Sequence, residues 1–135
     1  MALQFSVLVR NALLDALETQ IGATAVLRIR SGAAPATCAT ADSGTALASM
    51  TLPADWMAAA SAGAKDKSGT WSDASADAAG TAAHFRIYAS DGTTCGMQGT
   101  VTATGGGGDL TLDNVVIASA QLVTITGFTL TAPGV

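Results

Sequence analysis

The feature that most constrains the fold is the stretch Thr81–Thr102, whose alternation of residue types predicts a long, half-buried β-hairpin. From Ala83 to Tyr88 apolar and polar residues alternate, which is the two-residue period of a strand with one side packed on a core. Asp91-Gly92 then provides the turn, because glycine adopts the positive φ that tight hairpin turns require. We expect this hairpin to be the central strand pair of the scaffold. The residues expected to point away from the core are His84, Arg86, Tyr88 and Ser90.

Residues 6–21 predict a single amphipathic helix near the N-terminus. Ser6 is a suitable N-cap, and Gly22 is placed to end the helix in a left-handed conformation. Apolar residues recur at three- and four-residue spacing along one side. We expect this side to cover one opening of a β-sandwich, and docking onto a partner is the alternative use of the helix. The apolar stripe consists of Val9, Leu13, Leu14, Leu17 and Ile21.

Short apolar runs separated by Gly-rich turns follow from residue 24 to residue 131 and predict a mainly β chain. Their spacing favours an antiparallel β-sandwich or jelly roll with one N-terminal amphipathic helix, and a closed barrel is the competing architecture. The 135 residues correspond to one domain, residues 1–135. In the last predicted strand, Leu122–Thr131, the alternation changes phase at Thr126-Gly127, which predicts a β-bulge there.

Two segments between the predicted strands are expected to be exposed. Residues 31–44 are rich in Gly, Ala, Pro and small polar residues, which predicts a long surface loop. Residues 53–68 contain an Ala-rich run that suits a short helical turn, followed by Lys65-Asp66-Lys67, interpreted as a solvated charge cluster. Long loops in a small domain are common sites of partner contact.

The charge balance and the lengths of the apolar runs argue against nucleic-acid binding, a membrane span and a signal peptide. The chain has six Lys and Arg against ten Asp and Glu, for a net charge of −4. A basic surface that would neutralise a run of phosphates is therefore not expected, which argues against nucleic-acid binding. The apolar runs are shorter than the ~18 residues of a membrane span. The N-terminus also lacks the pattern of a signal peptide, because Arg10 and Asp15 interrupt its apolar segment.

The motifs that usually carry chemistry are weak in this sequence, and we expect neither an enzyme nor a cofactor or metal site. His84 is the only histidine, which removes any triad or metal cluster that needs two; we expect it to be an exposed strand residue. Asp73 and Asp77 are interpreted as turn residues. Cys38 and Cys95 are 57 positions apart, and we favour free thiols over a disulfide between them.

Six side chains are the candidates for contact with another protein. Arg28 and Arg30 share one side of a predicted strand and suit acidic groups, either of a partner or of the same subunit. Trp56 is interpreted as a lid over the core in preference to an exposed contact residue. The full set of candidate contact residues is Arg28, Arg30, Trp56, Met57, Lys65 and Lys67.

Four segments carry a family resemblance that covers nearly the whole chain. They are residues 10–17 (RNALLDAL), 27–32 (LRIRSG), 83–94 (AHFRIYASDGTT) and 99–101 (GTV). In order and spacing they resemble a widespread family of small tailed-phage and prophage virion proteins. The resemblance implies a capsid decoration, or cement, protein of the jelly-roll kind on an HK97-like shell. The family has no catalytic residues to carry over to this chain.

The resemblance also implies partners and a location. The expected partners are the major capsid protein or other virion proteins, together with copies of the same chain in a homo-oligomer. The expected location is the capsid surface of the virion, after assembly in the host cytoplasm. Two alternatives remain open: a tail, neck or fibre component, and a carbohydrate- or receptor-binding module with Trp56, Trp71 or Tyr88 as a stacking platform.

Overall fold

The computed structural model describes residues 2–135 and is mainly β with one N-terminal helix, as predicted. Helix α1 (Val7–Ile21) has the expected ends: the Ser6 side chain accepts a hydrogen bond from the Val9 N–H, and Gly22 has φ 95°. Within the described residues no helix is long and apolar enough to cross a membrane. The strands are β1 (Val26–Arg30), β2 (Ala46–Thr51), β3 (Ala64–Asp66), β4 (Trp71–Asp73), β5 (Gly80–Thr81), β6 (His84–Tyr88), β7 (Cys95–Ala103), β8 (Leu110–Leu112), β9 (Val116–Ile117), β10 (Val123–Ile125) and β11 (Thr129–Thr131).

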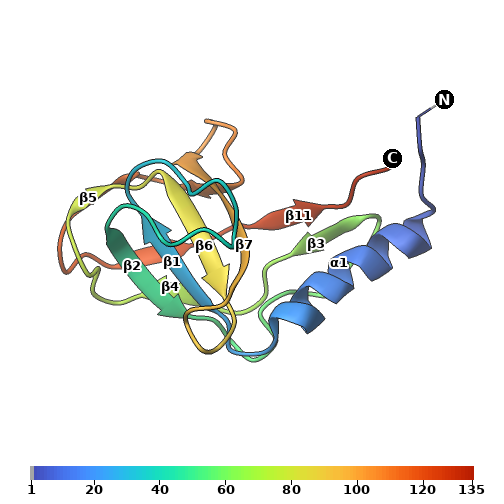
Figure 1. Ribbon diagram of the computed structural model, residues 1–135, viewed down its shortest axis with the longest axis horizontal. Coiled ribbons are helices and arrows are strands. Elements are labelled where there is room, and N and C mark those ends of the chain that lie inside the picture. Colours follow the sequence, from blue (N-terminus) through green and yellow to red (C-terminus); the bar gives the residue numbers. More distant parts are fainter. Residues whose placement is uncertain (1) are drawn as a thin grey trace.

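A five-stranded sheet in the order β2-β1-β6-β7-β8 forms the main body and curls around the core (Figure 1). The predicted hairpin is confirmed, because β6 and β7 pair antiparallel around the Asp91-Gly92 turn. Cys95 lies opposite Tyr88 and Met97 lies opposite Ile87, so Gly96 is an extra residue that forms a bulge. The sheet is mixed and not purely antiparallel, since β8 runs parallel to β7.

Three short strand pairs, β10–β4, β11–β3 and β5–β9, complete the fold. The predicted bulge at Thr126-Gly127 is wrong. The chain instead leaves β4 after Ile125 and pairs with β3 from Thr129 onward. The change of phase in the sequence therefore marks a change of partner strand, which local alternation cannot distinguish from a bulge.

Strand β3 lies in the segment that was expected to contain a short helical turn. It pairs with β11 from Ala64 opposite Thr131 to Asp66 opposite Thr129. Its residues are small or charged and carry no β-branched signal. The pairing with β11, 63 to 67 positions later in the chain, makes this segment a strand.

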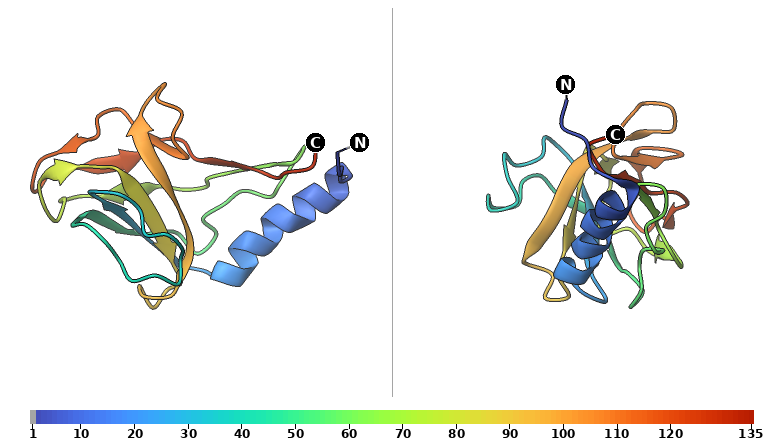
Figure 2. Two further views of the ribbon diagram at one scale, coloured as in Figure 1. Left: turned by 45° about the horizontal axis from the view of Figure 1, so that its top comes forward. Right: turned by 90° about the vertical axis from the view of Figure 1, so that its right-hand side faces the viewer.

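Helix α1, β3 and β11 together form an arm that projects from the β body (Figures 1 and 2). The helix does not cover an opening of the body, as the sequence had suggested. It touches the body mainly at its last residue, Ile21, which lies on Gly96 of β7. A Cβ at position 96 would be 2.5 Å from the Ile21 Cγ1, so only glycine permits this approach.

A row of aromatic side chains fixes the base of the arm to the body. The ring centroids of Trp56 and Trp71 are 6.0 Å apart, those of Trp71 and Phe128 are 5.5 Å apart, and those of Phe128 and Phe85 are 5.7 Å apart. Trp56 is fully buried, so its expected role as a lid over the core is confirmed. Its indole N–H also donates to the Gly22 carbonyl at 2.9 Å, which ties the end of α1 to the same row.

Replacing Leu27 with alanine tests the core. Leu27 is the second residue of β1 and has no exposed surface, and we expect Leu27→Ala to lower the free energy of unfolding by about 2–5 kcal/mol through the cavity it leaves. Leu122→Ala is the matched control, because Leu122 is 62% exposed, and it should change stability by less than about 0.5 kcal/mol. Urea denaturation measures both. Equal losses in the two variants would contradict this description of the core.

Candidate interaction surface

Helix α1 turns its charged side toward its own arm. The Arg10 guanidinium donates to the Ala132 carbonyl at 3.1 Å, and it lies over Gly63, where a Cβ would be 2.3 Å from its Cζ. The Asp15 carboxylate accepts from the Ala60 N–H at 3.0 Å, and the Glu18 carboxylate accepts from the Met57 N–H at 3.0 Å. The polar side chains of the helix therefore satisfy backbone groups of Met57, Ala60 and Ala132.

Lys65 completes this contact as a buried cation. Its ammonium group is 2.7 Å from Asp15 and 3.1 Å from Glu18, and its side chain is 3% exposed. Burial lowers the pKa of Lys65, but the two carboxylates raise it by more, so that the ammonium form is favoured. The interpretation of Lys65 as part of a solvated charge cluster is therefore wrong. The local sequence around Lys65 gives no sign of the carboxylates of Asp15 and Glu18, which lie 47 or more positions earlier in the chain.

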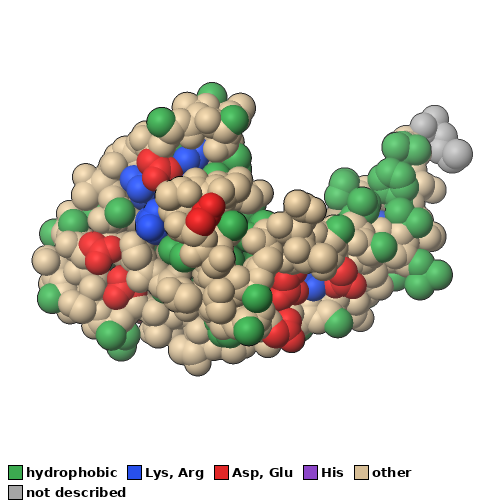
Figure 3. Space-filling view, turned by 60° about the horizontal axis from the view of Figure 1, so that its bottom comes forward, with side chains coloured by type: hydrophobic (Ala, Val, Ile, Leu, Met, Phe, Trp, Pro, Cys, Tyr) green, Lys and Arg blue, Asp and Glu red, His purple; other side chains and the backbone are tan. Residues whose placement is uncertain are grey.

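The opposite side of the helix is apolar and faces solvent. Val9, Leu13 and Leu17 are 46%, 46% and 41% exposed, whereas Leu14 and Ile21 of the predicted stripe are buried. Figure 3 shows hydrophobic side chains gathered towards the free end of the projecting arm, with acidic and basic side chains nearer the body. A helix of this kind is inverted relative to an ordinary surface helix, which buries its apolar side. We define the outer face of α1 as six exposed residues, all uncharged: Val9, Ala12, Leu13, Ala16, Leu17 and Gln20.

A groove of about 610 Å³ continues the outer face toward the β body. One wall is the C-terminal half of α1, including Leu13 and Leu17, and the other comes from the β6–β7 hairpin, including Ala89 and Gly96. All of its lining residues are uncharged. The outer face and the groove together form one continuous uncharged surface.

The β6 strand is covered on its second side by the loop of residues 31–44. The Arg86 guanidinium is 2% exposed; it donates to the Asp42 carboxylate at 2.6 Å and to the carbonyls of Thr37 and Thr40 at 2.9 Å. On β7, the Gln98 side chain accepts from Arg86 at 2.9 Å and donates to a loop carbonyl. Arg86 is thus the side chain of the sheet that makes several of the hydrogen bonds anchoring the loop.

Asp42 is the carboxylate at the centre of this contact. It also binds Arg30 at 2.8 Å and accepts from the Tyr88 hydroxyl at 2.6 Å. Burial raises the pKa of Asp42, but the hydrogen bonds from Tyr88 and Arg86 and the charge of Arg30 lower it by more, to below 3.8. One side chain from the loop therefore neutralises two cations of the sheet.

The expectation that His84, Arg86 and Tyr88 point to solvent is wrong. All three are buried, and the His84 Nδ1 is 2.8 Å from the Gly32 carbonyl. The alternation correctly placed these residues on the side of β6 away from Phe85 and Ile87. It carried no information on what covers that side.

The six candidate contact residues all lie against groups of their own chain. Trp56, Met57 and Lys65 are buried in the arm and its base, and Arg30 is buried under the loop. Arg28 and Lys67 are half-buried. Arg28 donates to the Gly92 carbonyl at 2.7 Å and stacks on Tyr88, while Lys67 donates to the Gly69 carbonyl at 2.7 Å. Contact with a partner stays a prediction for these residues.

The aromatic side chains offer little surface for stacking on a sugar ring. Trp56, Trp71 and Tyr88, named as possible platforms, are each at most 1% exposed. Among residues 2–135, Phe5 is the one exposed aromatic residue, and it lies against Gly134 near the tip of the arm.

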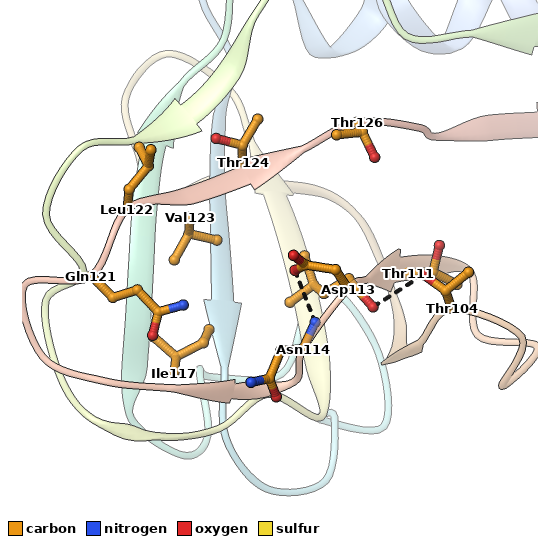
Figure 4. Close-up of a pocket in the computed structure, with 11 residues that line it drawn as sticks. Thr104, Thr111, Asp113, Asn114, Ile117, Gln121, Leu122, Val123, Thr124 and Thr126 are labelled. Atoms are coloured by element: carbon orange, nitrogen blue, oxygen red, sulfur yellow. Dashed lines mark hydrogen bonds between the residues drawn. The ribbon is translucent and has the colours of Figure 1, made fainter.

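A second hollow of about 300 Å³ lies between β8, the β8–β9 turn and β10 (Figure 4). Its polar residues have local structural roles. The Asp113 carboxylate accepts from the Asn114 N–H at 2.8 Å, the Asn114 side chain accepts from the Val116 N–H at 2.9 Å, and the Gln121 side chain accepts from the Ala118 N–H at 2.8 Å. These bonds shape the two turns. Residues 2–135 contain no group of three or more His, Cys, Asp and Glu that could hold a metal.

Cys38 and Cys95 are both free thiols, as favoured from the sequence, although the fold brings them together. Burial raises the pKa of the Cys95 thiol to about 12, with a further contribution from a hydrogen bond with Cys38. The loop of residues 31–44 thus places Cys38 beside β7, which sequence separation did not indicate.

The contact between the loop and the sheet is tested by Asp42→Asn. Two buried guanidiniums would lose their carboxylate, but Asp42 is itself 35% exposed and solvent screens part of the interaction, so we expect the free energy of unfolding to fall by about 1–3 kcal/mol at neutral pH. Because the pKa of Asp42 is lowered in the folded state, its contribution is present above pH 3.8 and is lost as the pH falls through the folded-state pKa. The difference between wild type and variant should therefore shrink in acid.

Urea denaturation at a series of pH values measures this dependence. Asp77→Asn is the matched control, because Asp77 is exposed, and it should change stability by less than about 0.5 kcal/mol at any pH. A loss below about 1 kcal/mol for Asp42→Asn at neutral pH, as for an ordinary surface pair, would contradict the assignment.

Comparisons of this chain with protein-family models, with curated proteins and with solved structures found no match.

Proposed function

We propose that this chain is a non-enzymatic virion structural protein, a capsid decoration protein that stabilises the HK97-like shell of a tailed phage. Its main partner is the major capsid protein, and it acts on the capsid surface after assembly in the host cytoplasm. The proposal assigns it no cofactor, nucleic acid or membrane as a partner. It originates in the family resemblance of residues 10–17, 27–32, 83–94 and 99–101.

The observation that carries the proposal is the projecting arm, whose helix has an uncharged apolar outer face. A cement protein needs surfaces that adhere to other virion proteins, and one weak contact suffices because it is repeated over many copies. The opposite side of α1 is held to the rest of the arm by the ion pairs of Lys65 with Asp15 and Glu18. The outer face is therefore presented on a defined support.

The β body supports the proposal as a compact scaffold. The loop of residues 31–44 is fixed on the main sheet through Asp42, and the short pairs β10–β4 and β5–β9 contribute Trp71, Val123 and Ile117 to the same core as that sheet. We include in the proposal the jelly-roll relationship that the resemblance implies, in which these short pairs correspond to a second layer.

The location of the protein in the particle tests the proposal. Cryo-electron microscopy and quantitative mass spectrometry of virions from the phage that encodes the chain should find it on the shell, in copy numbers comparable to the major capsid protein. Capsids that lack it should lose their DNA at lower temperature. A handful of copies at the tail or neck would overturn the decoration role in favour of a tail component, and absence from purified virions would overturn both.

A further inference from the structure

We propose that the outer face of α1 packs against the outer face of α1 in another copy of this chain, forming a closed homo-oligomer centred on Leu13. The inference concerns the protein outside the particle. It deepens the proposed function by naming a second copy as the occupant of the outer face, and a test without phage particles distinguishes its failure from failure of the capsid role.

The first argument is the distribution of exposed apolar side chains. Seven of the ten large hydrophobic residues that are exposed lie between Leu3 and Leu17, and the others are scattered at residues 116, 122 and 135. Single exposed hydrophobic residues are normal, but a contiguous patch marks an interaction site. On α1 the patch is contiguous because Val9, Leu13 and Leu17 follow one another at four-residue spacing.

The second argument is charge. The chain has a net charge of −4, so two copies repel each other over most approaches. Helix α1 carries Arg10, Asp15 and Glu18; Arg10 and Glu18 are turned inward to the arm, and the half-exposed Asp15 carboxylate is paired with Lys65 at the edge of the outer face. Two outer faces can thus meet without placing like charges together. This absence of charge favours a second copy over a partner that would be recognised by its basic or acidic groups.

The third argument is the symmetry of the pattern. A face that binds itself must be self-complementary. The ridge formed by Val9, Leu13 and Leu17 is symmetric about Leu13, so that in a two-fold pair Val9 of one copy meets Leu17 of the other and Leu13 meets Leu13. Ridges at four-residue spacing are those that interdigitate when helices pack. Ala12 and Ala16 flank the ridge and allow the helix axes to approach closely.

The groove beside α1 completes the fit. It opens along Leu13 and Leu17 and has a volume of about 610 Å³, enough to receive several aliphatic side chains of the second copy. Gln20 lies at its edge as a polar rim residue. This arrangement of an apolar centre with a polar edge is the usual anatomy of an interface between subunits.

The full chain tests the proposal in the absence of phage particles. Light scattering after size exclusion and sedimentation velocity, over micromolar to submillimolar concentrations, should give a whole-number multiple of 13.3 kDa above one. Leu13→Glu and Leu17→Glu should shift the protein to monomer, with at least a tenfold higher dissociation constant. Leu122→Glu is the matched control, because Leu122 is also exposed but is remote from α1, and it should leave the mass unchanged.

Two results would overturn the proposal. One is a wild-type protein that is monomeric over the whole range, which would leave the outer face to a different partner. The other is an unchanged oligomer in Leu13→Glu, which would place the interface elsewhere. Circular dichroism and thermal unfolding verify that the variants are folded.

A cross-linking experiment keeps the proposal testable if the glutamate variants do not fold. Cys38 and Cys95 are first replaced with serine, and Leu13→Cys is added to that background. Oxidation with copper phenanthroline should link two chains through Cys at position 13 in high yield, visible on a non-reducing gel. The same experiment with Leu122→Cys should give little cross-link. Equal yields at the two positions would overturn the proposal.

Discussion

The contact between Asp42 and Arg86 is the interaction on which the β body depends most. Arg28 and Arg86 lie opposite each other on β1 and β6, and Arg30 is two positions further along β1. Cationic side chains directly across a strand pair repel. Asp42 supplies the compensating carboxylate from the loop of residues 31–44, and the same bonds hold the loop over the sheet. Strand β6 can therefore be buried on both sides although three of its five residues are polar.

In the arm, the polar and apolar sides of the helix are reversed relative to an ordinary surface helix. On α1 the charged residues face inward and bind Lys65 and the backbone of the arm, while the aliphatic residues face solvent. Removing one partner from a buried ion pair is costly, which fixes the rotation of the helix about its axis. The exposed aliphatic ridge is a consequence of that rotation. The ion pair of Lys65 therefore determines that Leu13 and its neighbours on the outer face point to solvent.

The contact of Asp42 with the sheet and the ion pair of Lys65 with α1 have a common consequence for function. The polar side chains that sequence reasoning offered to a partner, such as Arg30 and Lys65, are engaged within the chain, and the hydrophobic side chains offered to the core, such as Leu13 and Leu17, are exposed. Recognition through apolar contact is suited to a protein that assembles in many copies, because each contact can be weak. The proposed capsid role and the proposed self-association both use this property, on a rigid support.

The sequence by itself determined the features that depend on neighbouring residues: the helix and its caps at Ser6 and Gly22, the hairpin turn at Asp91-Gly92, and the mainly β class. Only the tertiary structure decided which sides of these elements are covered. Residues far apart in the chain make those decisions, such as Asp42 for β6, Lys65 for α1 and β11 for β3. Periodicity shows that an element has two different sides, but it does not show which side another segment will bury.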